Sequence, residues 1–179
     1  MSLSFYRLSH LISRMDGAEL QLLLSSFRCS AEPAAENFLK NIAVRHEKNS
    51  ISRTYLMLEL NGPDGNIVKG FFTLAIKCLS LDERHCIPED IFEQMNVDRK
   101  VAQAYLLGQL AKADGAEKGL GKIMMKRALG IFSNGHEMFG CKVIRLDCKD
   151  KLIGYYESCG FAFTGKNRDG SLNQMVAII

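Results

Sequence analysis

The sequence predicts an α/β or α+β fold in which helices accompany a mixed sheet. Helical and strand-like hydrophobic patterns alternate along the chain, which is typical of such folds. The 179 residues are enough for one domain with a sizeable core and no supporting disulfide or metal. An apolar content of 47% and a charged content of 24% are ordinary for a folded protein. Because no repeat or low-complexity linker interrupts the chain, residues 1–179 are expected to form a single domain.

The N-terminal half is expected to contain two helices and three strands. A first strand is predicted over residues 5–9, followed by helices over 18–26 and 34–47. Two aromatic and aliphatic runs, 53–60 and 67–77, predict a pair of strands. They flank Asn61-Gly62-Pro63-Asp64-Gly65, a strong turn signal, so the sequence predicts a hairpin here.

The C-terminal half continues the alternation. A short helix is predicted from Pro88 to Met95, and the apolar run at 103–111 predicts a buried strand. The remaining elements are strands at 142–148, 161–164 and 174–179, with helices at 119–132 and 150–159.

The predicted helix at 119–132 has one apolar and one basic face. The apolar face consists of Leu120, Ile123, Met124, Ala128 and Ile131, which follow the 3.6-residue period. The opposite face carries Lys118, Lys122 and Lys126, each four residues apart. Residues 112–127 hold five basic and two acidic side chains, so they account for the whole net charge of +3. Such a row of lysines is typical of a solvated helix face, unless the preceding loop makes it an anion site.

The loop in front of this helix contains Gly115, Gly119 and Gly121. The first N–H groups of a helix lack intrahelical partners and lie at the positive end of its dipole. Glycines would let a phosphate approach these groups closely. A P-loop is excluded because Ala116 and Ile123 occupy its outer Gly and hydroxyl positions. A dinucleotide fingerprint fails at Met124, which leaves a pyrophosphate on a helix start after a buried strand.

The six cysteines are expected to be reduced and mostly buried. They contain no Cys-x-x-Cys pair, and no paired histidines stand at ligand spacing, so no metal is expected. His85 beside Cys86 is a poor nucleophile pair because adjacent side chains point apart in regular structure. The longest uncharged run, residues 101–111, is too short to span a bilayer, and the N-terminus lacks a signal-peptide core. A cytoplasmic protein that does not enter the membrane is therefore expected.

Two motifs together resemble the GNAT superfamily of acyl-CoA-dependent N-acyltransferases. Residues 116–121, AEKGLG, take the place of motif A, Arg/Gln-x-x-Gly-x-Gly/Ala, with both glycines matched and Ala116 in place of Arg or Gln. Residues 152–161, LIGYYESCGF, match Ala/Leu-x-x-x-Tyr-x-x-x-Gly-Phe. The resemblance covers roughly the C-terminal half. It implies a central mixed, mostly antiparallel sheet flanked by helices, acetyl-CoA as cosubstrate, and a homodimer.

The N-terminal half is similar to GNAT toxins of bacterial toxin-antitoxin modules, which acetylate the amine of aminoacyl-tRNA. The similar stretches are 27–29 (FRC), 37–39 (NFL), 52–55 (SRTY) and 67–74 (IVKGFFTL). Ser30 stands where a Gly commonly follows the Cys, and Gln109 where an Arg often precedes Leu-Ala. The strand at 145–148 (RLDC) looks more like other small GNAT enzymes. Membership of the toxin subgroup would imply an antitoxin partner.

The resemblance also implies roles for particular residues. Backbone groups around Leu110, Ala111 and Lys112 would bind the pantetheine amides of CoA. The N–H groups from Lys118 through Gly119, Leu120 and Gly121 to Lys122 would hold the pyrophosphate. Glu117 puts a carboxylate beside that pyrophosphate, which Lys118 and Lys122 would offset in part. Tyr156 would protonate the departing thiolate as general acid, whereas without the family match it is better explained as a core residue.

The acceptor and the general base stay open. At pH 7 a lysine amine is neutral about once in a few thousand molecules, and an α-amine about one time in ten. An α-amine therefore needs less help from a base, although Asp82, Glu83 or Asp147 could act through water. Three functions remain: an N-acetyltransferase for the primary amine of a small molecule or peptide, a GNAT toxin acting on aminoacyl-tRNA, and a catalytically silent acyl-CoA sensor.

Overall fold

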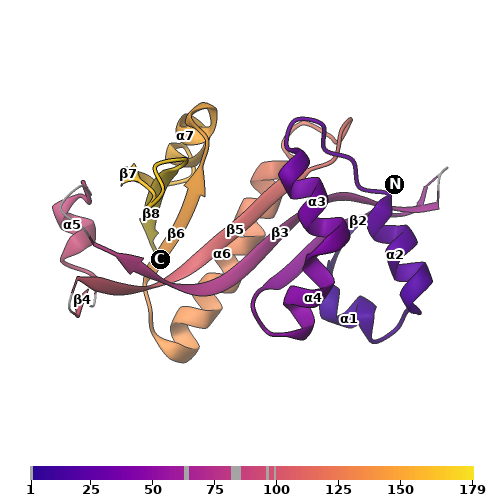
Figure 1. The fold of residues 1–179 in the computed structure, drawn as a ribbon, viewed down its shortest axis with the longest axis horizontal. Coiled ribbons are helices and arrows are strands. Elements are labelled where there is room, and N and C mark those ends of the chain that lie inside the picture. Colours follow the sequence, from indigo (N-terminus) through magenta and orange to yellow (C-terminus); the bar gives the residue numbers. More distant parts are fainter. Residues whose placement is uncertain (1, 63–64, 82–85, 96, 99) are drawn as a thin grey trace. The chain divides into compact units, whose positions relative to one another are not determined.

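The computed structural model describes residues 2–62, 65–81, 86–95, 97–98 and 100–179 (Figure 1). In chain order the elements are β1 (Ser2–Arg7), α1 (Leu8–Ile12), α2 (Gly17–Ser25), α3 (Pro33–Asn41), α4 (Ala43–Lys48), β2 (Arg53–Gly62), β3 (Gly65–Ser80), α5 (Glu89–Phe92), β4 (Val97–Asp98), β5 (Val101–Lys112), α6 (Leu120–Phe139), β6 (Val143–Cys148), a 3-10 turn (Asp150–Leu152), α7 (Ile153–Glu157), β7 (Ala162–Lys166) and β8 (Asn173–Ile178).

The strands are hydrogen-bonded in the order β1-β2-β3-β5-β6-β8-β7, with β4 also paired to β5. β5 and β6 are parallel, whereas β1 with β2, β2 with β3, β4 with β5, β6 with β8 and β7 with β8 are antiparallel. This confirms the predicted mixed, mostly antiparallel sheet with helices. The parallel ladder is short: it joins Tyr105 to Ile144 and Leu106 to Arg145.

The chain forms two compact units that share β3, β5 and α6. The first unit contains Met1–Ala75 and Gln109–Arg127, and the second contains Ile76–Gly108 and Ala128–Ile179. In the first unit, α1 to α4 contribute to a core with one side of β2 and β3. Phe27 and Phe71 are fully buried there and pack edge-to-face with ring centroids 5.2 Å apart.

The start of α6 packs closely on β3 in the first unit. Gly70 allows this approach, because a Cβ at that position would lie 2.8 Å from the sulfur of Met124 and 3.1 Å from the carbonyl oxygen of Ala111. The buried face of this part of the helix consists of Leu120, Met124, Met125 and Ala128. Ile123, predicted to lie on it, is 53% exposed. The face turns toward Met125 instead, so Ile123 lies on its flank.

The second unit has its own core. One cluster is formed by Leu79, Leu81, Met95, Ala102, Ala104, Val143 and Val176. α6 continues here to Phe139, beyond the predicted end. Gly135 does not end the helix but lets it pack against the Tyr105 ring, since a Cβ at this position would lie 2.9 Å from the tyrosine hydroxyl oxygen. The helix ends before Gly140, whose φ of +78° suits glycine and whose carbonyl accepts the Tyr105 hydroxyl at 3.0 Å.

Two predicted helices are broken in the structure. The helix predicted at 34–47 is interrupted at Ile42, whose φ and ψ are −120° and −39°. The change of direction buries Glu47, whose carboxylate accepts the Thr54 N–H at 2.8 Å, and this tertiary hydrogen bond favours two short helices. The helix predicted at 150–159 begins as a 3-10 turn and continues as α7.

The first strand also differs from its prediction. It covers Ser2–Arg7 rather than residues 5–9, because its pairing with β2 ends at Arg7 and Leu8 begins α1. The turn predicted between β2 and β3 includes residues 63–64, which lie outside the described residues. β2 and β3 are antiparallel and pair through Gly62 and Gly65, so the predicted hairpin is present.

Candidate functional site

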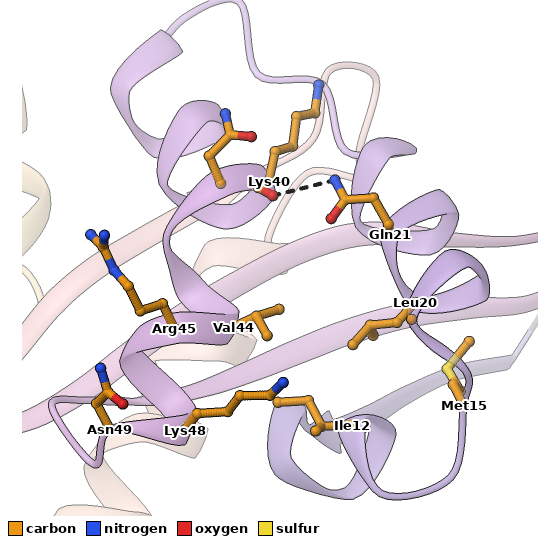
Figure 2. Close-up of a pocket in the computed structure, with 11 residues that line it drawn as sticks. Ile12, Met15, Leu20, Gln21, Lys40, Val44, Arg45, Lys48 and Asn49 are labelled. Atoms are coloured by element: carbon orange, nitrogen blue, oxygen red, sulfur yellow. Dashed lines mark hydrogen bonds between the residues drawn. The ribbon is translucent and has the colours of Figure 1, made fainter.

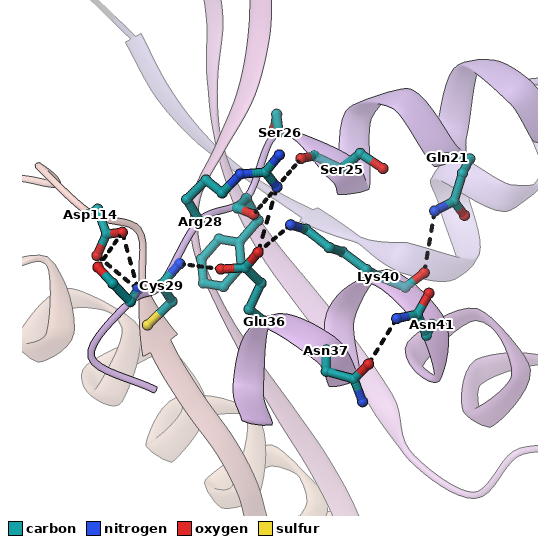
Figure 3. Close-up of polar contacts among 12 residues, drawn as sticks. Gln21, Ser25, Ser26, Arg28, Cys29, Glu36, Asn37, Lys40, Asn41 and Asp114 are labelled. Atoms are coloured by element: carbon teal, nitrogen blue, oxygen red, sulfur yellow. Dashed lines mark hydrogen bonds and ion pairs between the residues drawn. The ribbon is translucent and has the colours of Figure 1, made fainter. Parts of the chain in front are cut away.

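The loop between β5 and α6 is anchored at its start by two neighbouring segments. Ala113 donates its N–H to the Lys69 carbonyl at 2.8 Å, and Asp114 donates its N–H to the Arg28 carbonyl at 2.8 Å. The Asp114 carboxylate in turn accepts the Ser30 N–H, 3.1 Å from each oxygen, and the Ser30 hydroxyl at 2.7 Å (Figure 3). The loop is therefore tied both to β3 and to the segment between α2 and α3.

That segment is itself held by Glu36 at the start of α3 (Figure 3). One carboxylate oxygen accepts the Cys29 N–H at 2.8 Å, and the other pairs with Lys40 and, at 3.5 Å, with Arg28. The Lys40 hydrogen bond and then the Cys29 N–H hold the pKa of Glu36 below its usual value. Glu36 thus helps to fix the backbone from which Ser30 reaches Asp114.

The second half of the loop presents backbone donors. The N–H groups of Glu117, Lys118, Gly119 and Gly121 have no hydrogen-bond acceptor among the described residues. Gly119 has a φ of +95°, and no atom lies within 4 Å of the position that a Cβ would take, so the turn is open at this residue. These donors precede or begin α6, where the helix dipole is positive. The arrangement can bind an anionic group such as a pyrophosphate.

Two members of the predicted donor set are used within the turn. Leu120 donates its N–H to the Glu117 carbonyl at 3.3 Å, and Lys122 donates to the Gly119 carbonyl at 3.0 Å. The side chain of Leu120 is buried, whereas those of Glu117 and Lys122 are exposed. Candidate pyrophosphate contacts therefore come from alternate backbone groups and from exposed lysine side chains.

The end of β5 directs alternate backbone groups to opposite sides. Gln109 donates its N–H to the Thr73 hydroxyl at 2.8 Å, and Ala113 donates to Lys69, so both point toward β3. By the alternation of a strand, the backbone N–H and C=O groups of Leu110 and Lys112 point away from β3. Ala111 belongs to the β3-facing set, so Leu110 and Lys112 are the stronger candidates for pantetheine contacts.

Charged side chains surround this loop. Lys112, Lys118 and Lys122 are exposed, and the Lys112 ammonium lies 3.4 Å from the Ala116 carbonyl oxygen. Glu117 is exposed as well, whereas the carboxylate of Asp114 is occupied by Ser30. The cationic groups can therefore attract an anion, while Glu117 is the acidic side chain free to oppose it.

Tyr156 belongs to the second unit. It lies on α7 and is 7% exposed, between the rings of Tyr155 and Phe161, whose centroids are 5.1 and 6.0 Å away. Burial, followed by the nearby Cys148 thiol, raises the pKa of Tyr156 far above its ordinary value. The phenol is thus a neutral proton donor at physiological pH.

The turn after α7 explains the Cys-Gly-Phe sequence. Gly160 has a φ of +89° and donates its N–H to the Glu157 carbonyl at 2.9 Å, and Phe161 donates to the Tyr156 carbonyl at 3.1 Å. These two bonds form the C-terminal cap in which glycine is preferred. The cap brings Phe161 back against the Tyr156 ring and fixes the orientation of that ring.

Of the candidate bases, Asp147 lies within the described residues. Asp147 accepts two hydrogen bonds of 3.1 Å from Arg145, so its carboxylate is already ion-paired. Asp82 and Glu83 lie outside the described residues, as does His85. The six cysteines are free thiols, but the prediction that most are buried was wrong: Cys29 and Cys148 are buried, Cys141 and Cys159 are intermediate, and Cys78 and Cys86 are exposed. The exposed pair lies at the end of β3 and in the segment before α5, outside the core clusters.

Within the described part of the chain, no group of three or more His, Cys, Asp or Glu residues could hold a metal ion. No helix among the described residues is long and apolar enough to cross a membrane.

The first unit contains the predicted cofactor residues from Leu110 to Lys122, and the second contains the predicted acid, Tyr156. Sequence reasoning missed the role of Ser30 and Asp114; the Asp114-Gly115 pair was the available turn signal.

The chain matches no protein-family model and no curated protein sequence. Comparison with solved structures shows that it has the GNAT fold, which it shares with AtaT and KacT. It is similar to AtaT complexed with acetyl-methionyl-tRNAfMet, with a TM-score of 0.74 and 21% identity over 96% of this chain and 94% of AtaT. It is also similar to a Tyr-to-Phe mutant of KacT, with a TM-score of 0.74 and 17% identity over 97% of this chain and 94% of KacT.

A third similar structure is AtaTR bound with acetyl-CoA, with a TM-score of 0.68 and 21% identity over 98% of this chain and 92% of that one. The GNAT fold predicted from two short motifs is thereby confirmed, and the similarity extends through the N-terminal half that those motifs do not cover. At these identities the comparison establishes the fold.

Proposed function

We propose that the protein is a GNAT-type N-acetyltransferase that transfers the acetyl group of acetyl-CoA to the α-amine of an aminoacyl-tRNA. The observation that carries the proposal is the loop before α6, which presents unpaired backbone N–H groups at the position of motif A. The nearly full-length similarity to AtaT, a protein solved with acetyl-methionyl-tRNAfMet, supports the choice of acceptor. Acetyl-CoA acts as cosubstrate, and no metal takes part in the proposed transfer.

The cofactor is held mainly by backbone groups. The N–H groups of Lys118, Gly119 and Gly121 bind the pyrophosphate, aided by the dipole of α6. Lys118 and Lys122 add positive charge beside it. The outward-facing backbone groups of Leu110 and Lys112 bind the pantetheine amides, as one strand binds another.

The exposed Glu117 opposes the pyrophosphate by like-charge repulsion, and Ala116 supplies no side-chain donor where the family has Arg or Gln. Acetyl-CoA therefore binds less tightly than it would with a neutral residue at 117. Removing that carboxylate separates the effect of the charge from that of the backbone.

Tyr156 acts as the general acid. The neutral amine attacks the thioester carbonyl carbon, the carbon–sulfur bond breaks, and the departing sulfur receives the phenolic proton of Tyr156. The attacking nitrogen loses its own proton to water or to a base. The raised pKa of Tyr156 does not prevent the transfer, because an environment that disfavours phenolate also raises the pKa of a neighbouring thiol.

The carboxylate of Asp147 is ion-paired with Arg145 and is therefore not a free base. The α-amine of an aminoacyl-tRNA suits such a protein because it needs little help from a base. With a pKa near 8, such an amine supplies the neutral nucleophile in about one molecule in ten at pH 7. A lysine amine would need a strong base for the same reaction. The general N-acetyltransferase on other primary amines is the coarser form of this proposal.

The decisive experiment separates cofactor binding from acceptor choice. Calorimetry should show saturable acetyl-CoA binding, and a thiol-release assay should show turnover with charged tRNA but little with small amines or free amino acids. Absence of acetyl-CoA binding would refute the enzyme altogether. Binding with turnover on small amines would refute the tRNA acceptor, and binding without any turnover would favour a catalytically silent acyl-CoA sensor.

An antitoxin partner and a homodimer belong to the same proposal. AtaTR and a KacTA-DNA complex are among the similar structures, and this supports a partner protein that binds the acetyltransferase. Co-expression with the product of an adjacent small gene, followed by size-exclusion chromatography with light scattering, measures both the complex and the number of subunits. A monomer that forms no complex would contradict this part of the proposal.

A further inference from the structure

A pocket of about 500 Å³ lies among the N-terminal helices of the first unit (Figure 2). Its lining residues come from α1, α2, the end of α3, α4 and the adjoining turns, outside the loop proposed to bind the cofactor. Pockets of this volume accommodate small ligands or a few side chains of a bound peptide. The pocket thus needs an explanation that the acetyl-CoA site does not supply.

The floor of the pocket is aliphatic. It consists of Ile12, Met15, Leu20 and Val44, whose side chains extend toward the space between the helices (Figure 2). Among the described residues that line it none is aromatic, so they offer no stacking surface for a nucleobase. An aliphatic side chain is the group that gains most by burial on this floor.

The rim of the pocket is cationic. It contains Lys40, Arg45 and Lys48, and no acidic side chain of the described part of the chain lines it, so it disfavours an amine or another cation. Lys40 is already paired with Glu36. Arg45 and Lys48 are exposed and form no ion pair with a described residue, which leaves two positive charges for a ligand.

Amide side chains complete the rim. Gln21, Asn41 and Asn49 line the pocket, and Gln21 donates a long hydrogen bond of 3.4 Å to the Lys40 carbonyl across it (Figure 2). Amides both donate and accept hydrogen bonds, as a peptide backbone requires. A ligand that combines an aliphatic group, carboxylates and backbone amides matches all three sets of lining residues.

We propose that this pocket is a docking site for an acidic peptide segment of a partner protein, with an aliphatic side chain on the floor and flanking carboxylates on Arg45 and Lys48. The carboxylates give direction and charge selectivity, and the aliphatic side chain supplies the apolar contact. This inference does not depend on the acetyltransferase activity.

The test uses a labelled peptide with a central leucine flanked by glutamates, titrated with the full chain in fluorescence anisotropy. Replacing the peptide's glutamates by glutamines, or its leucine by alanine, should weaken binding about tenfold or more. The double variant Arg45→Gln with Lys48→Gln should weaken binding to the same extent. Lys126→Gln, an exposed lysine of the same unit outside the pocket, is the matched control and should leave binding unchanged.

Two readouts complete the test. Unchanged circular dichroism excludes global unfolding of a variant, and the acetyl-CoA affinity of the double variant should equal that of the wild type. Binding that is lost equally in Lys126→Gln, or that tolerates the glutamine peptide, would overturn the proposal. So would a single-stranded RNA oligonucleotide that competes for the pocket better than the peptide does.

Discussion

Ser30 holds the carboxylate of Asp114 with its backbone N–H at 3.1 Å and its hydroxyl at 2.7 Å, across 84 residues of sequence. The contact fixes the start of the loop whose later N–H groups are proposed to bind pyrophosphate. It also holds the Asp114 carboxylate in hydrogen bonds to Ser30, so its oxygens are not free to approach an anionic ligand. A serine at this position therefore orders the loop and keeps a negatively charged side chain in place.

Ser30→Ala should weaken acetyl-CoA binding about threefold to tenfold, the effect of one hydrogen bond to a charged group. The backbone N–H bond remains, so the fold should be retained. Calorimetry measures the affinity, and Ser13→Ala is the control because it removes a similar exposed hydroxyl bond, to the His10 carbonyl, at a distance along the chain from the loop. Equal affinities for the wild type and Ser30→Ala would show that the contact does not order the cofactor loop.

Gly119→Ala should lower acetyl-CoA affinity about tenfold or more. The residue has a φ of +95°, where an alanine costs about 1–2 kcal/mol, and its methyl group would project from the turn proposed to hold the pyrophosphate. Gly130→Ala lies within α6, has no positive φ and has open space around it, so this control should instead raise the melting temperature. Retained affinity in Gly119→Ala would place the pyrophosphate elsewhere.

Tyr156→Phe should lower kcat about 100-fold or more while acetyl-CoA affinity changes little, because only the proton donor is lost. Tyr155→Phe removes the neighbouring hydroxyl and should retain most of the activity. Burial and the Cys159 thiol raise the pKa of Tyr155 to about 12. Steady-state kinetics with the acceptor identified by the thiol-release assay measure both variants. A larger loss in Tyr155→Phe would transfer the acid role to Tyr155.

The pH dependence of the reaction follows from the raised pKa of Tyr156. The rate should rise with pH as an α-amine acceptor loses its proton around pH ~8. It should not fall again up to about pH 10, because the phenol is still protonated there. A fall in kcat at or below about pH 10 would indicate an acid with an ordinary or lowered pKa.

Acid should weaken the first unit through Glu36. Its pKa is lowered in the folded state, so its contribution to stability is present above the unfolded value of about 4.3 and is lost as the pH falls through the folded pKa. Urea unfolding of Glu36→Gln should therefore depend less on pH below about 5 than unfolding of the wild type. Parallel pH profiles of the two proteins would contradict this role.

The sequence predicted the fold best where local patterns decide it. The aromatic and aliphatic runs at 53–60 and 67–77 and the apolar run at 103–111 predicted β2, β3 and β5, and the two short motifs predicted the GNAT fold. The break at Ile42 could not be predicted because it depends on the buried Glu47 accepting the Thr54 N–H. Likewise Ser30 and Asp114 meet only through the tertiary fold. Contacts between distant residues leave no periodic signal in the chain.

The alternation at the end of β5 has a consequence for mutagenesis. If the amides of Leu110 and Lys112 are the groups that recognise pantetheine, an alanine scan of this strand would leave every one of them in place and register almost nothing. Replacing a single amide by an ester, or Leu110 by proline, removes the N–H itself. Because the ligand contacts are made by the main chain, two proteins with different side chains on this strand can bind the same ligand.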